Sequence, residues 1–242
     1  MRLDRYLANS GYGSRSEVKE MIHQGLVRVD GAVCRDSGCS VRDDGSQLIC
    51  IDNQTVVLKR QVHLMMHKPA GVITAMEDPR HQTIADLIPE RLRSAGLFPI
   101  GRLDRDATGL LLLTNDGTLC HRLASPRWQV WKTYAVTVEG KAFDSAEIAD
   151  FENGLILADG QHCRSAQLII EGPSQALLTI HEGKYHQVKK MMLATGRRVT
   201  ALHRQSIGPL SLDNKLAAGE SRELTEAEMT SLYNLVELDI LQ

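Results

Sequence analysis

The sequence predicts an α+β protein of two domains, a small one over residues 1–54 and a larger one over residues 62–242. The expected strands outnumber the expected helices, and the helices do not alternate with them as they would in a doubly wound sheet. A length of 242 residues suits one large domain or two smaller ones. Around residues 55–61 the polarity changes without a core pattern, so we place the linker there.

The small domain is expected to fold as two short helices and a hairpin. A first short helix in "RLDRYLANSG" is ended by Gly11 and Gly13. Ser14 and Glu17 form a capping box for a second helix, and Gly25 has the position of a C-terminal glycine. The segment "LVRVDGAVC" predicts two short strands joined by a two-residue Asp-Gly turn. Several basic residues decorate this unit, a composition compatible with RNA binding.

The larger domain begins with strands and short helices. "VHLMMHKPAGVIT" predicts a strand, a turn and a second strand, and "TIADLIPERL" predicts a short helix capped by Thr83. The four leucines of residues 110–113 predict a buried strand, and "WKTYAVTVEG" alternates like a half-buried one. A helix is expected in "DSAEIADFENG", between the cap Asp144 and the stop signal Gly154.

The second half of this domain continues the same mixture of elements. "ILADGQHCRSAQLII" and "ALLTIHEG" predict strands. "KYHQVKKMMLATG" predicts a helix whose inner face carries Tyr185, Val188 and Met192. Further short strands follow, and a capping box at Thr225 introduces a last helix.

Composition and motifs exclude several classes of function. The five cysteines contain no CxxC pair and are expected to be free thiols. No stretch resembles a signal peptide or a membrane span, so we expect a cytoplasmic protein. "GYGSRS" lacks the third glycine of a dinucleotide fingerprint, and no P-loop, GxSxG or HExxH motif is present. We therefore expect neither a nucleotide cofactor nor a bound metal.

Charge is unevenly distributed along the chain, although the formal net charge is only −2. The segment from residue 220 onward is acidic, whereas residues 181–205 are rich in lysine and arginine and contain three histidines. A local basic patch attracts phosphate more strongly than the total charge suggests. On this feature alone, an ordinary solvated helix face explains the pattern equally well.

The densest group of charges lies in "GRLDRDATGLLLLTNDG", residues 101–117. An exposed turn with weakly paired charges is one interpretation. The leucines, however, draw Asp104 toward the interior, where an ionised carboxylate needs a partner. Asp104 and Asp106 point the same way along an extended chain, but a metal-dependent phosphodiesterase would need further acids nearby.

The same stretch resembles the signature GRLDxxTxGLLLLTxDG of the bacterial ribosomal-RNA pseudouridine synthases. "HKPAGVIT", "KTYAV", "EGKYHQVKKM" and "LHRQSIGPLSL" are similar to four further motifs of that family, in the same order. "RLDRYLANSGYGSRSEVKEMIHQGLVRVDG" resembles the alpha-L (S4-like) RNA-binding domain that precedes their catalytic domain. "EDPRHQTI" and the Tyr-His-Gln-Val-Lys form point to the branch that modifies small-subunit rRNA. His67 is a departure, since many relatives have asparagine there, and we expect it to be tolerated.

This resemblance implies a catalytic domain with a mixed, mostly antiparallel sheet, and an isomerase that converts a uridine of rRNA to pseudouridine. The bond from N1 to the sugar breaks and a bond from C5 to the sugar forms without redox change, so no cofactor is required. The resemblance assigns the first step to the carboxylate of Asp104, which attacks the sugar or the base or assists elimination. A fixed cation beside that carboxylate is expected, and the resemblance assigns it to Lys189. We expect Arg105 and Asp106 to be ordinary loop charges.

The resemblance also implies residues that bind the RNA. The target base must be flipped out, and it would stack on Tyr134, whose phenol oxygen would also be placed to handle the proton on C5. Leu202 is expected to line the pocket wall, and Arg102 to fill the gap that the flipped base leaves. Phosphate contacts are expected from five basic residues of the small domain, which are Arg2, Arg5, Arg15, Lys19 and Arg28.

Three alternatives stay open. One is a large-subunit rRNA synthase of the same family. Another is a non-catalytic RNA-binding protein on the same scaffold, although intact Asp104, Tyr134 and Lys189 argue against it. The third is a metal-dependent RNA hydrolase, which sensitivity to a chelator would reveal. We expect a monomer whose partner is ribosomal RNA or a ribosome-assembly intermediate.

Overall fold

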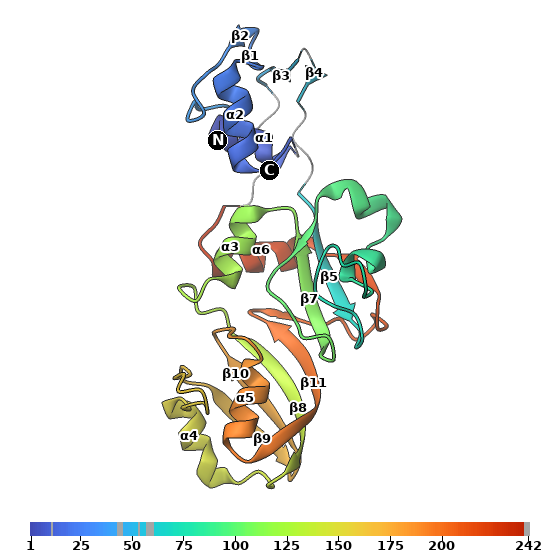
Figure 1. The fold of residues 1–242 in the computed structure, drawn as a ribbon, viewed down its shortest axis with the longest axis vertical. Helices are drawn as coiled ribbons and strands as arrows, with labels where there is room; N and C mark the ends of the chain where they lie inside the picture. The colour runs from blue at the N-terminus through green and yellow to red at the C-terminus, as the bar shows by residue number, and fades with distance from the viewer. Residues whose placement is uncertain (11, 43–45, 53, 57–60, 240–242) are drawn as a thin grey trace. The chain divides into compact units, whose positions relative to one another are not determined.

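The computed structural model describes residues 1–242 except 11, 43–45, 53, 57–60 and 240–242. Its contacts form two compact units, which are drawn together in Figure 1. Of the described residues, the first unit contains 1–62 with 115–117, and the second contains 63–114 and 118–239. Among the residues described, no helix is long and apolar enough to cross a membrane.

The first unit combines two helices with a small antiparallel sheet. The helices are α1 (Leu3–Asn9) and α2 (Arg15–Gln24). The sheet has the order β2 (Ala32–Val33), β1 (Val27–Val29), β3 (Ile49–Ile51) and β4 (Gln54–Thr55). Apolar side chains from both helices and from the two central strands share one core, which includes Leu3, Leu7, Val18, Ile22, Val27 and Ile49.

Local signals in this unit act as the sequence predicts. The hydroxyl of Ser14 accepts a hydrogen bond from the N–H of Glu17, whose carboxylate accepts one from the N–H of Ser14. Gly25 ends α2 in the left-handed conformation, with φ 80°. Between β1 and β2, Asp30 and Gly31 have φ 50° and 84°, as a two-residue hairpin turn of this hand requires. The second helix and the hairpin are therefore confirmed.

Two expectations fall partly on residues outside the description. Gly11, the expected end of the first helix, is one of them; α1 itself ends at Asn9. The expected linker at residues 55–61 begins at the end of β4 and then enters residues 57–60, which are not described.

The second unit is built on a mixed sheet of nine strands. Along its main path the order is β13 (Ser221–Glu223), β5 (His63–Lys68), β7 (Thr108–Thr114), β11 (Arg197–Ile207), β8 (Lys132–Gly140), β10 (Gln175–Ile180) and β9 (Gln167–Gly172). Two short strands lie beside this path, β6 (Phe98–Pro99) on β7 and β12 (Leu210–Ser211) on β11. Only β7 and β11 pair in parallel in the described register, so the expected mixed, mostly antiparallel sheet is confirmed.

The β7–β11 junction brings two backbones unusually close. Gly109 lies opposite Arg204 in the register and has φ +108°. A Cβ atom added to Gly109 would lie 2.3 Å from the carbonyl oxygen of Arg204, so only glycine fits there. The loop that carries Asp104 enters β7 at this junction, and the approach therefore holds that loop against β11.

Helices and strands of the second unit share two cores. α3 (Gly117–Ala124) and α6 (Glu226–Leu235) contribute to one of them together with β5 and β7. α4 (Ile148–Asn153) and α5 (Gln187–Ala194) contribute to the other together with β8, β9 and β10 (Figure 1). The second core also contains four side chains near the expected site, which are Leu103, Ala107, Tyr134 and Leu202.

Most elements of this unit lie where the sequence predicts them, but four expectations are wrong. After β5, Ile73 makes only an isolated bridge with Thr83 instead of a second strand. In "ILADGQHCRSAQLII", Ile156 and His162 likewise form only a single bridge, whereas the end of that segment forms β9 as expected. Tyr185 precedes α5 and is exposed, so it does not belong to the inner face of that helix, whereas Val188 is buried as expected.

The segment "TIADLIPERL" forms 3-10 turns instead of a regular α-helix. They are η1 (Ile84–Leu87) and η2 (Glu90–Ala95). Thr83 caps η1 as predicted, with Asp86 completing the capping box. Pro89 lies between the two turns, and a proline disfavours helical geometry at the residue before it, which explains the interruption.

Candidate active site

The loop before β7 is held by the chain segment that follows β5. The hydroxyl of Thr74 donates to the carbonyl of Leu103 at 2.7 Å and accepts from the N–H of the same residue at 3.1 Å. The N–H of Gly71 donates to the carbonyl of Arg105 at 2.8 Å, and Nε of Arg105 returns a bond of 3.1 Å to the carbonyl of Gly71. These bonds bracket Asp104 on both sides and give it a defined position.

A buried lysine completes this support. Lys68 is fully buried, and its Nζ donates to the carbonyls of Pro69 and Ala107 at 2.9 Å and of Arg105 at 3.4 Å. Burial lowers the pKa of Lys68 to about 8, although the charges of the nearby aspartates act in the opposite direction. The "HKPAGVIT" segment therefore acts as the clamp of the Asp104 loop, since Lys68, Gly71 and Thr74 all bind its backbone.

Asp104 faces two cationic or potentially cationic side chains at the start of α5. Nζ of Lys189 lies 3.1 Å from Oδ2 of Asp104, and Nε2 of His186 lies 3.5 Å from Oδ1. The side chain of Asp104 is 24% exposed, against 72% for that of Asp106. Asp104 is therefore the more enclosed of the two carboxylates, and its partner is the lysine that the resemblance indicates.

Asp106 binds the same lysine. Nζ of Lys189 lies 2.6 and 2.9 Å from the two carboxylate oxygens of Asp106. This hydrogen bond lowers the pKa of Asp106, with burial acting against it. Burial also disfavours the charged form of Lys189, but the bonds to Asp106 and Asp104 outweigh it and raise the lysine pKa. The expectation that Asp106 is an ordinary loop charge is therefore wrong, because its carboxylate binds the lysine that faces Asp104. Arg105 is an exposed loop charge whose Nε bonds the backbone of Gly71.

A buried arginine lies beneath Tyr134. Arg204 is 2% exposed, and its Nε donates to the carbonyl of Leu110 at 2.7 Å. Its Nη1 lies 3.5 Å from both the phenol oxygen of Tyr134 and the carbonyl of Arg102. Its Nη2 is buried and has no hydrogen-bond partner among the described residues. Arg204 thus links the Asp104 loop to Tyr134 and places a fixed positive charge between them.

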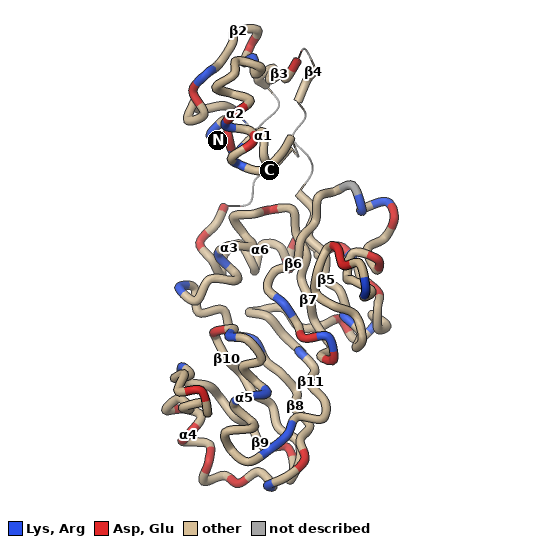
Figure 2. Tube along the Cα trace, in the orientation of Figure 1, with Lys and Arg blue, Asp and Glu red and all other residues tan. Residues whose placement is uncertain are grey.

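Of the remaining residues expected at this site, Leu202 and Tyr134 are buried and Arg102 is exposed. Leu202 and Tyr134 are both buried in the same core, on neighbouring strands β11 and β8. Lys132, two residues before Tyr134, donates to the carbonyl of Val130 at 2.9 Å, and burial with the charge of Arg204 lowers its pKa to about 8. The side chain of Arg102, in contrast to those of Leu202 and Tyr134, is exposed to solvent. Figure 2 shows both signs of charge mixed along this loop before β7.

His67, the departure from the family pattern, is accommodated by neighbouring polar groups. Its Nδ1 lies 2.9 Å from the carbonyl oxygen of Leu216. Its ring meets that of His203 edge to face at 5.6 Å, and Nδ1 of His203 lies 2.8 Å from the hydroxyl of Thr108. Burial, with the charge of His67, lowers the pKa of His203.

The five basic residues expected to contact phosphate differ in how far other groups of the protein already bind their side chains. Arg2 forms two hydrogen bonds to Asp4, at 3.0 and 3.1 Å, and Lys19 lies 4.0 Å from the same carboxylate. Burial raises the pKa of Asp4, but the bonds from Arg2 outweigh this and lower it overall. Of the others, Arg28 donates to the carbonyl of Gly31, Nε of Arg5 is buried without a partner in the described chain, and Arg15 is exposed.

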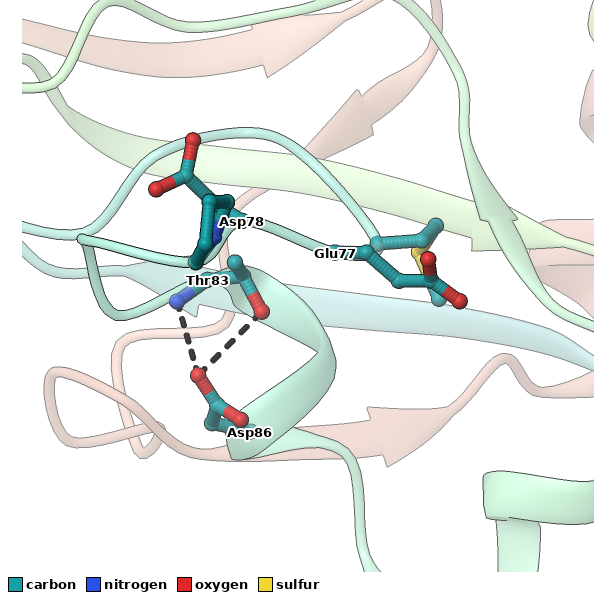
Figure 3. Close-up of a pocket in the computed structure, with 6 residues that line it drawn as sticks. Glu77, Asp78, Thr83 and Asp86 are labelled. Carbon is teal, nitrogen blue, oxygen red and sulfur yellow. Dashed lines mark hydrogen bonds between the residues drawn. The ribbon is translucent and has the colours of Figure 1, made fainter.

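A separate hollow of about 600 Å³ lies in the "EDPRHQTI" segment (Figure 3). Its lining includes the carboxylates of Glu77, Asp78 and Asp86. Asp86 accepts hydrogen bonds from the N–H and hydroxyl of Thr83, and Asp78 accepts from the N–H groups of the loop that follows it. Asp78 and Asp86 cap their own backbone, and all three acids would repel phosphate, so we do not place the substrate there.

The donor chemistry around Asp104 does not resemble a metal centre. In the described part of the chain, no three His, Cys, Asp or Glu side chains gather closely enough to hold an ion together. Asp104 and Asp106 instead converge on the ammonium group of Lys189. A two-carboxylate hydrolase would require a further acid at this point.

Three side chains of the site are ones that the sequence reasoning did not name. They are Lys68, His186 and Arg204, each of which lies inside a quoted motif: "HKPAGVIT", "YHQVK" and "LHRQSIGPLSL". The motifs showed which segments matter, but not which side chains turn toward Asp104. That depends on the packing of β5, β11 and α5 against one loop.

The chain is similar to known proteins over nearly its whole length. Residues 62–194 match the family described as RNA pseudouridylate synthase, and residues 1–44 match the S4 domain. The chain is 47% identical to an uncharacterised RNA pseudouridine synthase of Bacillus subtilis, over 95% of this chain and 97% of that one. It is 38% identical to the ribosomal small subunit pseudouridine synthase A of Vibrio cholerae, over 96% and 100%. A crystal structure of a pseudouridylate synthase superposes with a TM-score of 0.69, at 33% identity over 96% and 99%.

Proposed function

The chain belongs to the RNA pseudouridylate synthase family, and on that premise we propose that it isomerises one uridine of small-subunit ribosomal RNA. Membership makes it an isomerase that acts on RNA. The choice of the small subunit is supported by full-length similarity to proteins that are named for that activity. The domain division that we propose is an S4 domain at residues 1–54, a linker at 55–61 and a catalytic domain from residue 62.

The observation that carries this proposal is the position of Asp104. Its carboxylate lies 3.1 Å from the ammonium group of Lys189 on a loop whose backbone is bound by Lys68, Gly71 and Thr74. An ion pair on a preorganised loop holds a carboxylate in a defined direction, as a nucleophile or base requires. We assign the catalytic carboxylate to Asp104 and its fixed cation to Lys189.

The proposed reaction conserves all atoms. The bond between N1 of the base and C1′ of the ribose breaks, the base turns, and C5 bonds to C1′. C5 then loses its proton and N1 gains one, so the product is an isomer of uridine and needs no cofactor. Asp104 starts the first step, by attack on the sugar or the base or by assisting elimination, and the pairing with Lys189 supports each of these routes.

Tyr134 is proposed as the partner of the flipped base. Extruding a uridine costs a few kcal/mol, which stacking in an apolar pocket offsets in part. Tyr134 shares its core with Leu202, and Arg204 approaches its phenol oxygen. The phenol oxygen takes the C5 proton only after it gives up its own, and the nearby cation stabilises the phenolate formed between the two transfers, so the number of protons is unchanged. Arg102, exposed on the loop beside Asp104, is assigned to the gap left in the RNA.

The S4 domain is proposed to hold phosphates through its basic face. Arg15 is exposed and is the residue that we expect to contribute most. Arg2 and Lys19 share Asp4, so each carries less uncompensated charge toward RNA. Such contacts position an RNA without reading its sequence. We further propose a monomer that acts in the cytoplasm on ribosomal RNA or on a ribosome-assembly intermediate.

The proposal is tested by mapping pseudouridine. Purified protein is incubated with small-subunit and large-subunit rRNA from cells that lack it, with and without a chelator, and both RNAs are mapped. One new pseudouridine in small-subunit rRNA, unaffected by the chelator, is expected. Modification of large-subunit rRNA alone would overturn the substrate. RNA binding without modification would identify a non-catalytic protein, and chelator-sensitive strand cleavage would identify a hydrolase.

A further inference from the structure

One exposed aromatic ring has no part in the proposed chemistry. Tyr185 is 76% exposed although an aromatic side chain usually gains by burial. Its ring lies flat on that of His186, with centroids 3.9 Å apart and planes at 18°. The outer face of this stacked pair has no ring partner among the described residues, so it presents a flat aromatic surface to solvent.

Hydrogen bonds of buried side chains fix the loop that carries Tyr185 and His186. The side-chain amide of Gln187 donates to Glu182 at 2.6 Å, and its oxygen accepts from the N–H of Lys184 at 2.9 Å. Glu182 accepts a further bond from the N–H of Arg164 at 2.9 Å. Glu182 and Gln187 are both buried. The ring of Tyr185 is therefore displayed by an anchored turn, which reduces the entropy lost when a ligand stacks on it.

The stacked pair borders the proposed active site. Nε2 of His186 lies 3.5 Å from Oδ1 of Asp104, and Tyr185 is the next residue along the chain. His186 has φ 53°, so the chain turns sharply there just before α5. Nζ of Lys190 lies 5.9 Å from the centre of the Tyr185 ring. An aromatic face with a cation beside it, next to the site of a flipped nucleotide, matches the requirements of an unpaired nucleotide.

We propose that Tyr185, supported by His186, stacks on the base of a nucleotide that immediately flanks the target uridine. Flipping the uridine removes a stacking partner from its neighbours in the RNA. The exposed ring of Tyr185 replaces that lost contact and helps to keep the uridine outside the RNA stack. This inference rests on the proposed function and adds to it a binding residue for one neighbouring base, with no contact to the reacting atoms.

The proposal is tested with three protein variants and modified RNA fragments. The fragments are stem-loops around the uridine that wild-type protein is found to modify, either intact or with an abasic site at one flanking position. Tyr185→Ala removes the ring, and Tyr185→Phe keeps the ring without the hydroxyl. Ile169→Ala is the matched control, since it removes an exposed apolar side chain from β9, an edge strand distant in sheet order from β7 and β11.

On intact RNA, Tyr185→Ala is expected to weaken binding by about 10-fold, within the range of stacking on one base. Tyr185→Phe and Ile169→Ala are expected to bind within about two-fold of wild type. With an abasic site at the flanking position in question, wild type and Tyr185→Ala should bind alike. Equal affinity of Tyr185→Ala and wild type for intact RNA would overturn the proposal. The proposal would also be overturned if Tyr185→Ala bound more weakly than wild type both to RNA with an abasic site on the 5′ side of the uridine and to RNA with one on the 3′ side.

Failure of the proposed function gives a different result. If wild-type protein forms no pseudouridine in rRNA, the proposed function fails before any variant is compared. If wild-type protein modifies the fragment but Tyr185→Ala binds it equally well, only the stacking role is lost. Single-turnover rates at saturating enzyme separate weaker binding from slower chemistry for each protein.

Discussion

Lys189 lies closer to Asp106 than to Asp104: its Nζ is 2.6 Å from Oδ1 of Asp106 and 3.1 Å from Oδ2 of Asp104. The more exposed carboxylate therefore holds the lysine, and the lysine in turn faces the more enclosed one. This arrangement fixes the ammonium group mainly through Asp106, so the carboxylate of Asp104 keeps hydrogen-bonding capacity for a substrate. Asp106 is a positioning residue in this account.

Asp106→Asn should lower the pKa of Lys189 toward its ordinary value, because it removes the hydrogen-bond partner that raises it most. The pair stabilises the fold at neutral pH, and this contribution is lost as pH rises through the Lys189 pKa or falls through the Asp106 pKa. The lysine Cε resonance in 13C-labelled protein measures the midpoint. Asp159→Asn, which removes the partner of neighbouring Lys190, is the control. An unchanged Lys189 midpoint in Asp106→Asn would contradict this reading.

Lys68→Met should slow isomerisation on the order of 100-fold while RNA affinity stays within a few-fold. The substitution removes the ammonium group that binds the carbonyls of Arg105 and Ala107, and a small displacement of a catalytic group is costly. Single-turnover kinetics and a binding titration measure the two quantities, with circular dichroism as the check on folding. Wild-type turnover in a folded Lys68→Met protein would show that the clamp is dispensable.

Tyr134→Phe separates the two roles assigned to this ring. Phenylalanine keeps the stacking surface but removes the phenol oxygen that Arg204 approaches at 3.5 Å. If that oxygen handles the C5 proton, turnover should fall by about 10²–10⁴-fold with RNA affinity nearly unchanged. The measurement is the single-turnover rate with a binding curve for each protein. Turnover close to wild type would restrict Tyr134 to stacking.

Gly109→Ala should destabilise the second unit by roughly 2–6 kcal/mol, the sum of overpacking and backbone strain. Its Cβ would lie 2.3 Å from the carbonyl oxygen of Arg204, at φ +108°. Gly172→Ala is the control, because a Cβ there meets nothing within 4 Å, and it should stay within about 0.5 kcal/mol of wild type. Urea denaturation compares the three proteins. Equal stability of Gly109→Ala and Gly172→Ala would argue against the close approach of β7 and β11.

Local sequence signals predicted the elements well, because capping and turn chemistry act over a few residues. The capping boxes at Ser14 and Thr225 and the leucine strand β7 are examples. The strand order could not be derived this way, since it depends on contacts between distant segments. Tyr185 was misplaced because His186 adopts a left-handed conformation, so helical spacing counted from α5 does not extend to it.

The site could be predicted only in part. The resemblance placed Asp104 beside Lys189, 85 positions further along the chain, and the two lie 3.1 Å apart. No local pattern identifies Arg204, because an arginine in an alternating strand is ordinarily expected to face solvent, whereas this one is 2% exposed beneath Tyr134. The shared bonding of Asp106 was missed for a similar reason, since it depends on how α5 packs beside the loop.

Asp104→Asn tests the central claim most directly. The substitution preserves the size of the side chain and removes its charge, so the loop clamped by Lys68 and Thr74 should keep its shape. Pseudouridine formation in small-subunit rRNA should fall below detection, while RNA affinity remains within a few-fold of wild type. Turnover near the wild-type rate in a folded Asp104→Asn protein would contradict the assignment of Asp104 as the catalytic carboxylate.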